Sequence, residues 1–162
     1  MMRNLKYIIF LMLLSTSVFS QDSLSVYNPK ADAKAEINFA ISKAEKENKH
    51  ILLMIGGNWC RWCKMFDQLL KDSVAVDSAL NSNFIFQHVN FSKENKNLEL
   101  MKLYDFPQRF GFPVFVVLNS KGERIHTQNS EYLEQDKSYS VKKVIEFFGQ
   151  WGPSVLSPDL YK

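Results

Sequence analysis

Residues 50–64 read HILLMIGGNWCRWCK, and this stretch decides the fold. Residues 50–57 form an almost continuous apolar run that ends in two glycines. Unbroken apolarity of this length predicts a strand that is covered on both faces. Residues 60–72 follow at once, and their apolar side chains recur at helical spacing. The sequence therefore predicts that Cys60 lies at the N-terminus of a helix that emerges from a central strand.

Cys60 and Cys63 are the only cysteines of the chain, and three features favour a redox-active dithiol. A helix N-terminus carries a partial positive charge and unpaired N–H groups, which stabilise a thiolate. Two intervening residues let the second sulfur reach the first across one turn, so a mixed disulfide can resolve internally. Arg61 adds a neighbouring cation. We expect Cys60, in an exposed first turn, to be the nucleophile and Cys63, one turn deeper, to be the resolving cysteine.

Two other interpretations of the cysteine pair remain open, and a third is excluded. A zinc site needs four ligands, and His50, His88 and His126 could supply two of them, but they lack the close spacing of zinc fingers. A purely structural disulfide would close a very short loop and would constrain little unfolded-chain entropy. Covalent haem requires a histidine directly after the second cysteine, where this chain has Lys64.

The apolar pattern of the rest of the chain predicts an α/β architecture with one mixed sheet. We expect further helices over 31–48, 94–105 and 140–150, a strand over 84–91, and an antiparallel hairpin of strands 113–118 and 123–128. The predicted domain spans residues 31–150. A polar lead-in over 21–30, with a strand-like patch at 24–27, precedes it, and a tail over 151–162 follows it.

Residues 1–20 have the composition of a secretory signal. Arg3 and Lys6 precede an apolar run, and Val18 and Ser20 satisfy the small-residue rule for cleavage after Ser20. The run is shorter than the roughly 20 residues of a comfortable membrane span. We therefore expect a cleaved signal and an exported, periplasmic or extracytoplasmic protein, with an uncleaved anchor as the alternative. Export would place the cysteines where disulfides persist.

The overall composition is that of a packed globular protein, with 46% hydrophobic and 14% aromatic residues. The formal net charge is +3. Two of the basic residues lie in the stretch 1–20 and no acidic residue does, so the remaining chain is nearly neutral. It contains no block of Lys or Arg that would indicate nucleic-acid binding. We expect the protein to be a monomer.

The motif NWCRWCK at 58–64 and the later segment GFPVFVVLNSKGE at 111–123 resemble the thioredoxin superfamily. The chain looks most similar to exported thioredoxin-like proteins that are related to the periplasmic C-terminal domain of the membrane disulfide-interchange reductase. The resemblance implies a thioredoxin fold with Trp59 packed beside the site. It also implies a cis peptide bond before Pro113 and substrate-binding backbone groups on Phe112.

One departure from the thioredoxin pattern affects the expected proton transfer. Thioredoxins have a buried carboxylate before the motif and a lysine that partners it, and by alignment these positions are Met54 and His88. The proton of the resolving thiol must then pass to water, to His88 or to Asp67. We favour His88, because an imidazole titrates near neutral pH. The alternative is an ordinary strand histidine.

A second departure is the pair Arg61–Trp62, which replaces the Gly-Pro of thioredoxins. We expect these two residues, with Trp59 and Lys64, to shape the active site. A cation beside the nucleophile stabilises its thiolate, and a stabilised thiolate raises the reduction potential.

Together these features predict an exported thiol–disulfide oxidoreductase that mainly reduces disulfides in protein clients and uses no metal or organic cofactor. A separate redox partner, such as a membrane reductase, would recycle the cysteine pair. One alternative is a non-catalytic interaction module that binds partner chains through Trp62, Phe110 and Phe112. Another is a dedicated reductant for a single client such as an apocytochrome.

Overall fold

A central four-stranded sheet organises the computed structural model, which describes residues 25–162 and so leaves the expected signal at 1–20 outside. The strands, in the spatial order β2-β1-β3-β4, are β1 (His50–Gly56), β2 (Phe84–Asn90), β3 (Val114–Leu118) and β4 (Arg124–Asn129). β1 runs parallel to β2 and antiparallel to β3, which pairs antiparallel with β4. The predicted mixed sheet and its hairpin are confirmed.

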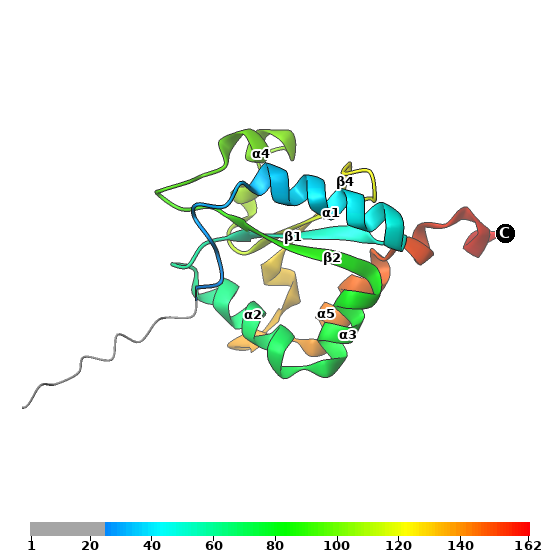
Figure 1. Ribbon diagram of the computed structural model, residues 1–162. Coiled ribbons are helices and arrows are strands. Elements are labelled where there is room, and N and C mark those ends of the chain that lie inside the picture. Colours follow the sequence, from blue (N-terminus) through cyan, green and yellow to red (C-terminus); the bar gives the residue numbers. More distant parts are fainter. Residues whose placement is uncertain (1–24) are drawn as a thin grey trace, which may run out of the picture.

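Helices cover both faces of this sheet (Figure 1). One face carries α1 (Ala33–Glu47) and α4 (Leu98–Leu103), and the other carries α2 (Arg61–Asp72), α3 (Val74–Asn83) and α5 (Val141–Gln150). No helix within residues 25–162 combines the length and apolarity needed to cross a membrane.

β1 is buried along its whole length because it lies between the two helical layers. Successive side chains of a strand point to opposite faces. Ile51, Leu53 and Ile55 accordingly pack with α1, whereas Leu52 and Met54 join the core beneath α2 and α5. This two-sided burial explains why the sequence is continuously apolar here instead of alternating.

α1 confirms the helix expected over 31–48, although it begins two residues later, at Ala33. Asp32 caps its N-terminus by accepting a hydrogen bond from the amide of Ala35 at 3.0 Å. Asn48 ends it in the left-handed conformation, at a φ of 52°. Ile37 and Ala40, which lie on the apolar face of this helix, are buried against the sheet.

The structure differs from the sequence-based expectations in three helical segments. α3 was not predicted, because its sequence VAVDSALNSN is short and rich in Ser and Asn. The helix expected over 94–105 begins only at Leu98, since Asn97 has a positive φ of 46°. In the expected tail, Pro153–Leu156 and Pro158–Tyr161 form short 3-10 turns.

Two further segments differ from what the sequence predicts. The strand-like patch expected at 24–27 is wrong for residues 25–27, which form no strand, and Leu24 lies outside the described residues. A small hairpin of β5 (Glu134–Gln135) and β6 (Ser138–Tyr139) was not predicted, because two-residue strands leave no periodic pattern.

Phe148 on α5 offers a test of the core beneath the sheet. Its side chain is fully buried and packs against Phe84, at 5.7 Å between ring centroids. We expect Phe148→Ala to lower the free energy of unfolding by about 3–5 kcal/mol through lost burial and a residual cavity. Urea unfolding followed by tryptophan fluorescence measures this change.

The control for this experiment is Tyr132→Ala, since Tyr132 is 74% exposed. It should alter the free energy of unfolding by no more than about 0.5 kcal/mol. A loss at Phe148 no larger than that at Tyr132 would contradict the assigned packing of α5.

Candidate active site

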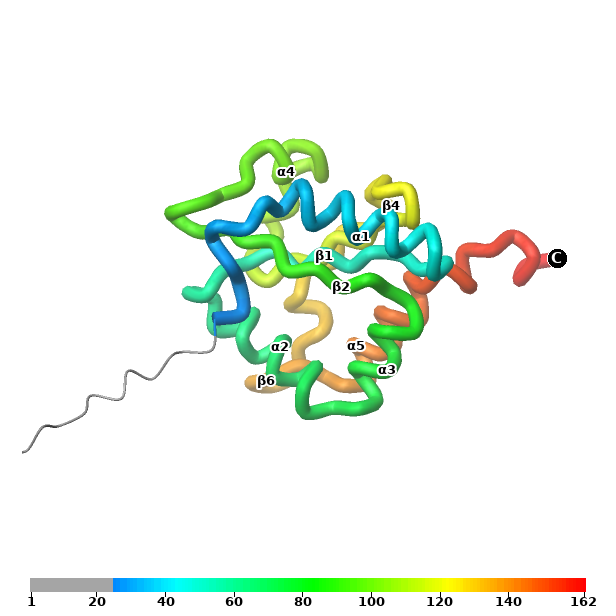
Figure 2. Tube along the Cα trace, in the orientation of Figure 1, coloured from blue at the N-terminus to red at the C-terminus, as the bar shows by residue number. Residues whose placement is uncertain are grey.

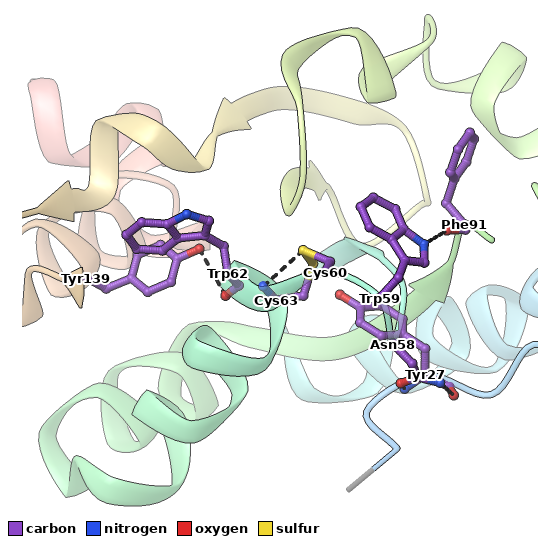
Figure 3. Close-up of a disulfide and its surroundings, with 8 residues drawn as sticks. All are labelled: Tyr27, Asn58, Trp59, Cys60, Trp62, Cys63, Phe91 and Tyr139. Atoms are coloured by element: carbon purple, nitrogen blue, oxygen red, sulfur yellow. Dashed lines mark hydrogen bonds between the residues drawn. A yellow bond between two sulfur atoms is a disulfide. The ribbon is translucent and has the colours of Figure 1, made fainter. Parts of the chain in front are cut away.

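The two cysteines lie at the junction between the end of β1 and the start of α2 (Figure 3). Cys60 is the N-cap residue of α2, and a disulfide joins it to Cys63, at 5.3 Å between the Cα atoms. The amide N–H of Cys63 donates to Sγ of Cys60 at 3.1 Å. The predicted position at a helix N-terminus is confirmed. A thiolate at Cys60 would face the helix dipole and at least one amide donor.

Both cysteines are buried, which corrects the expectation of an exposed Cys60. Cys60 is 4% exposed and Cys63 is fully buried. They belong to the core cluster beneath the sheet, and the half-buried side chains of Trp62 and Phe112 pack against this cluster. The helical pattern of residues 60–72 could not predict this burial, because it depends on tertiary packing.

Two glycines allow the motif to approach the end of β1. A Cβ on Gly56 would lie 2.4 Å from Sγ of Cys63, and a Cβ on Gly57 would lie 2.4 Å from the indole nitrogen of Trp59. Real Cβ atoms do not approach other heavy atoms so closely. The double glycine of the sequence is therefore a packing requirement of the site.

Trp59 and Phe112 form an aromatic wall beside the disulfide. The indole of Trp59 is 59% exposed, donates to the carbonyl of Phe91 at 2.9 Å, and meets the ring of Phe112 edge-on at 5.2 Å. Trp59 and Phe91 also line a hollow of about 200 Å³, whose rim includes Lys93 and Lys96. Trp59 therefore packs beside the site, as the resemblance implied.

The loop before β3 brings Pro113 next to this wall. The Phe112–Pro113 peptide bond is cis, which confirms the expectation. Pro113 is buried, whereas Phe106 and Phe110 of the preceding loop are 52% and 39% exposed. The loop that leads to the cis bond therefore presents two apolar rings to solvent.

Arg61, Trp62 and Lys64, which flank Cys63, differ in their contacts and exposure. Trp62 lies edge-on against Tyr139 at 5.3 Å, and the hydroxyl of Tyr139 donates to the carbonyl of Trp62 at 3.3 Å. Arg61 is exposed and forms no ion pair with any residue from 25 to 162, and Lys64 is half-buried. No local pattern indicated a role for Tyr139, which the unpredicted β5–β6 hairpin supplies.

Met54 and His88 are direct register partners on β1 and β2, as the alignment with thioredoxins requires. Nε2 of His88 lies 3.3 Å from Oδ1 of Asp67, although not in hydrogen-bond geometry. Burial lowers the pKa of His88, and the attraction of Asp67 only partly offsets this effect. His88 and Asp67 are thus brought together, and His88 is mainly neutral near pH 7.

The three histidines considered for zinc lie in three different settings. Nδ1 of His50 is 2.8 Å from the carbonyl oxygen of Trp151, and His126 stacks on the indole of Trp151 at 4.0 Å. His88 meets the ring of Tyr27 edge-on. Within residues 25–162, no three His, Cys, Asp or Glu side chains gather as metal ligands would.

The lead-in contributes a residue that the sequence analysis missed. Tyr27 is 1% exposed and lies in the same core cluster as the cysteines. The side chain of Asn58 holds its backbone, since Oδ1 accepts from the Tyr27 amide at 2.9 Å and Nδ2 donates to the Tyr27 carbonyl at 2.8 Å. A lone aromatic residue in a polar stretch was the only signal in the sequence.

Comparison with known proteins shows which family has this arrangement of sheet, helices and cysteines. The family model described as thioredoxin-like matches residues 32–120, more than half of the chain. The chain belongs to the thioredoxin-like family. The mixed sheet flanked by helices is accordingly a thioredoxin fold, and its cysteine pair occupies the place expected for a disulfide oxidoreductase of this family.

Solved structures of similar proteins extend this result. A disulphide isomerase from Xylella fastidiosa Temecula1 is 27% identical, with a TM-score of 0.69 over 77% of this thioredoxin-like chain and 95% of the isomerase. The oxidised C-terminal domain of Neisseria meningitidis DsbD is 22% identical, with a TM-score of 0.55 over 75% of this chain and 97% of that domain. The second likeness shows the shared fold.

Among curated proteins, the matches are local. A stretch of 46 residues is 41% identical to Spermatogenesis-associated protein 20 of Mus musculus. The stretch represents 28% of this thioredoxin-like chain and 6% of the mouse protein. The corresponding rat protein is 39% identical over the same length. The chain thus matches only a small part of these longer relatives.

The lowered pKa of His88 predicts a stability that depends on pH. Between the pKa of folded His88 and about 6.5, the unfolded chain binds more protons, so the free energy of unfolding falls as the pH falls. We expect His88→Gln to reduce this fall. Urea unfolding of both proteins at pH 7.5 and pH 5.5 measures the difference.

His126 provides the comparison, because burial lowers its pKa as well. His126→Gln should reduce the same pH dependence, and the double variant should reduce it further. An unchanged fall in the free energy of unfolding between the two pH values in His88→Gln would contradict the assigned environment of His88.

Gly56 and Gly149 form a matched pair for testing the crowding at the disulfide. We expect Gly56→Ala to lower the free energy of unfolding by about 1–3 kcal/mol, because the new methyl group overpacks a filled site. No atom lies within 4 Å of the position of a Cβ on Gly149 in α5. Gly149→Ala should therefore raise the same quantity by roughly 0.5–1 kcal/mol. A tolerated Gly56→Ala would refute the close approach.

Proposed function

We propose that the protein is an exported thiol–disulfide oxidoreductase that mainly reduces disulfides in protein clients. The observation that carries this proposal is the Cys60–Cys63 disulfide at the N-terminus of α2, with the Cys63 amide aimed at Sγ of Cys60. A thiolate is a better nucleophile than a thiol, and this position favours a thiolate at Cys60. Membership of the thioredoxin-like family supports the same chemistry.

The proposed reaction starts from the reduced pair. The Cys60 thiolate attacks one sulfur of a client disulfide, forms a mixed disulfide and releases the other client sulfur as a thiolate. Cys63 then loses its proton, attacks Sγ of Cys60, and releases the remaining client sulfur. Two electrons pass from the cysteine pair to the client. Each client thiolate takes up one proton, and the pair ends as a disulfide.

Clients are proposed to bind across the aromatic wall of Trp59 and Phe112. Backbone groups of Phe112, beside the cis bond to Pro113, would pair with the extended client chain on either side of its cysteine. The exposed rings of Phe106 and Phe110 would extend this apolar contact. A transient client complex of this kind buries a modest area and dissociates readily.

The cysteine pair itself holds the two electrons, so the proposed reaction requires no metal or organic cofactor. A separate redox partner must return the pair to the dithiol state after each cycle, and a membrane reductase is the proposed donor. The sequence composition of residues 1–20 supports export to a compartment where client disulfides form.

A second candidate direction is disulfide isomerisation. The name of the Xylella fastidiosa relative, a disulphide isomerase, favours it. The exposed cation of Arg61 also stabilises the Cys60 thiolate and raises the reduction potential of the pair. Reduction and isomerisation share the first attack by Cys60 and differ in whether Cys63 completes the transfer.

The reduction potential of the pair distinguishes these directions. A reductase should equilibrate near the roughly −270 mV of thioredoxin, whereas an isomerase should lie at or above roughly −180 mV. Thiol trapping across a series of glutathione buffers measures the potential. A value above the second limit would contradict net reduction, and Arg61→Gln would then show whether the cation is responsible.

A trapping experiment tests the assigned order of the cysteines. Cys63→Ser should hold a disulfide-bonded peptide client on Cys60, because the resolving sulfur is absent. Cys60→Ser should capture at least about tenfold less, since its remaining thiol, on Cys63, is fully buried and lies inside the first turn of α2 instead of at its N-cap. Mass spectrometry without reductant quantifies the mixed disulfide that each variant forms with the peptide.

The double variant Cys60→Ser/Cys63→Ser is the control for these adducts. It should form none and should lose all reductase activity. Retained client binding and biological activity in the double variant would instead favour a non-catalytic interaction module. Equal capture by the two single variants would contradict the roles of the cysteines.

A further inference from the structure

Tyr27 lies at the active site although it precedes α1. Figure 2 shows the lead-in passing from the start of α1, on one side of the sheet, to the start of α2 on the other side. The two hydrogen bonds between its backbone and the side chain of Asn58 fix the lead-in next to the motif. The ring is held further by an edge-on contact with His88, at 5.3 Å between centroids.

The hydroxyl of Tyr27 and the sulfur of Cys63 approach the same point. A Cβ on Gly56 would lie 2.7 Å from Oη of Tyr27 and 2.4 Å from Sγ of Cys63. Figure 3 shows the phenol oxygen pointing toward the cysteine pair. The absence of a side chain at Gly56 is what lets the oxygen and the sulfur share this space.

The same hydroxyl is buried and has no hydrogen-bond partner among residues 25–162. A buried hydroxyl without a partner destabilises the state in which it occurs. A disulfide sulfur is a weak acceptor, whereas a thiolate is a charged and therefore strong one. Opening the disulfide would supply the partner that the oxidised protein lacks.

We propose that the Tyr27 hydroxyl donates a hydrogen bond to the sulfur of Cys63 when the disulfide is open, most strongly when that sulfur is a thiolate, and thereby promotes resolution of the mixed disulfide. This inference rests on the disulfide exchange proposed above. Met54, which belongs to the same core cluster as Cys63, has no proton to donate. Tyr27 is thus the donor that this site places beside the resolving sulfur.

The step balances without any further reactant. The Cys63 thiol gives its proton to water, and Tyr27 keeps its own proton while it stabilises the resulting thiolate. That thiolate attacks Sγ of Cys60, the new disulfide forms, and the client sulfur leaves as a thiolate that takes up a proton from water. Burial raises the pKa of Tyr27 well above its usual range, so the phenol stays protonated throughout.

Other titratable groups face this pair from three elements. α2 contributes Asp67, which is paired with Lys71 at 2.5 Å. β2 contributes His88, and β6 contributes Tyr139, whose hydroxyl already donates to a backbone carbonyl. All four groups remain in a Tyr27→Phe variant. A difference between this variant and the wild type therefore reports the Tyr27 hydroxyl alone.

The first measurement is the equilibrium constant of the cysteine pair against glutathione. The proposed hydrogen bond exists only in the open states, so Tyr27→Phe should destabilise the dithiol and favour the disulfide. We expect a shift of about tenfold, which corresponds to a potential lower by about 30 mV. The control is Tyr104→Phe, which removes a phenol hydroxyl from a buried tyrosine on the opposite face of the sheet and should leave the constant unchanged.

The second measurement is the pH dependence of resolution. A mixed disulfide of Cys60 with glutathione is prepared, and release of glutathione by Cys63 is followed in stopped flow. Tyr27→Phe should resolve about tenfold more slowly near pH 7, because the pKa of the Cys63 thiol rises without its donor. The deficit should vanish at a pH where Cys63 ionises fully in both proteins.

The third measurement separates this role from simple packing. The free energy of unfolding is compared for the oxidised and the reduced forms of each variant. Tyr27→Phe should leave the oxidised form as stable as the wild type, or more stable, and should destabilise the reduced form. An equal loss in both forms, with an unchanged pH profile, would overturn the inference and leave Tyr27 a packing role.

The outcomes also distinguish this inference from the proposed function. If the wild-type pair fails to exchange with client disulfides, the proposed function fails. The comparison of oxidised and reduced stability still decides whether Tyr27 bonds to Cys63. If the wild type exchanges normally and Tyr27→Phe matches it in potential and pH profile, only the inference fails.

Discussion

The crowding at Gly56 is the constraint on which the active site depends. The end of β1, the first turn of α2 and the N-terminal lead-in all converge at this residue, where any side chain would collide with Cys63 or Tyr27. The strand must therefore end in glycine, and α2 must begin within a few residues of it. These two requirements place Cys60 at the N-cap and direct the Cys63 amide to its sulfur. The position of the cysteine pair thus follows from packing at one Cα atom.

The sequence predicted those parts of the fold that depend on local patterns. β1 and β3 are buried on both faces and are therefore continuously apolar, and the helix after the motif has a clear apolar stripe. α3 escaped detection because it is short and has no clear apolar stripe, and the β5–β6 hairpin because each of its strands has only two residues. Contacts with α5 and α2 stabilise both segments. The late start of α4 depends on the conformation of one residue, Asn97, which no periodic pattern reveals.

The same distinction applies to the site. Cys60, Cys63, Trp59 and Pro113 belong to short motifs, so their placement could be expected from the sequence alone. The burial of Cys60 could not, because it results from the packing of the whole core cluster to which Cys60 belongs. Tyr27 precedes Asn58 by 31 residues, and Tyr139 follows Trp62 by 77 residues, yet both are hydrogen-bonded to the motif. Such distant contacts leave no trace in a local pattern, and the fold has to be known before these residues acquire meaning.

The hydrogen bonds between Asn58 and Tyr27 also bear on the order in which the site is assembled. Tyr27 leaves the ribosome before any residue of the sheet, yet its binding place consists of Asn58, Gly56 and α2, all of which are synthesised later. The lead-in can therefore bind only after β1 and α2 have come together. The surroundings of Cys63 are complete only when the lead-in has bound.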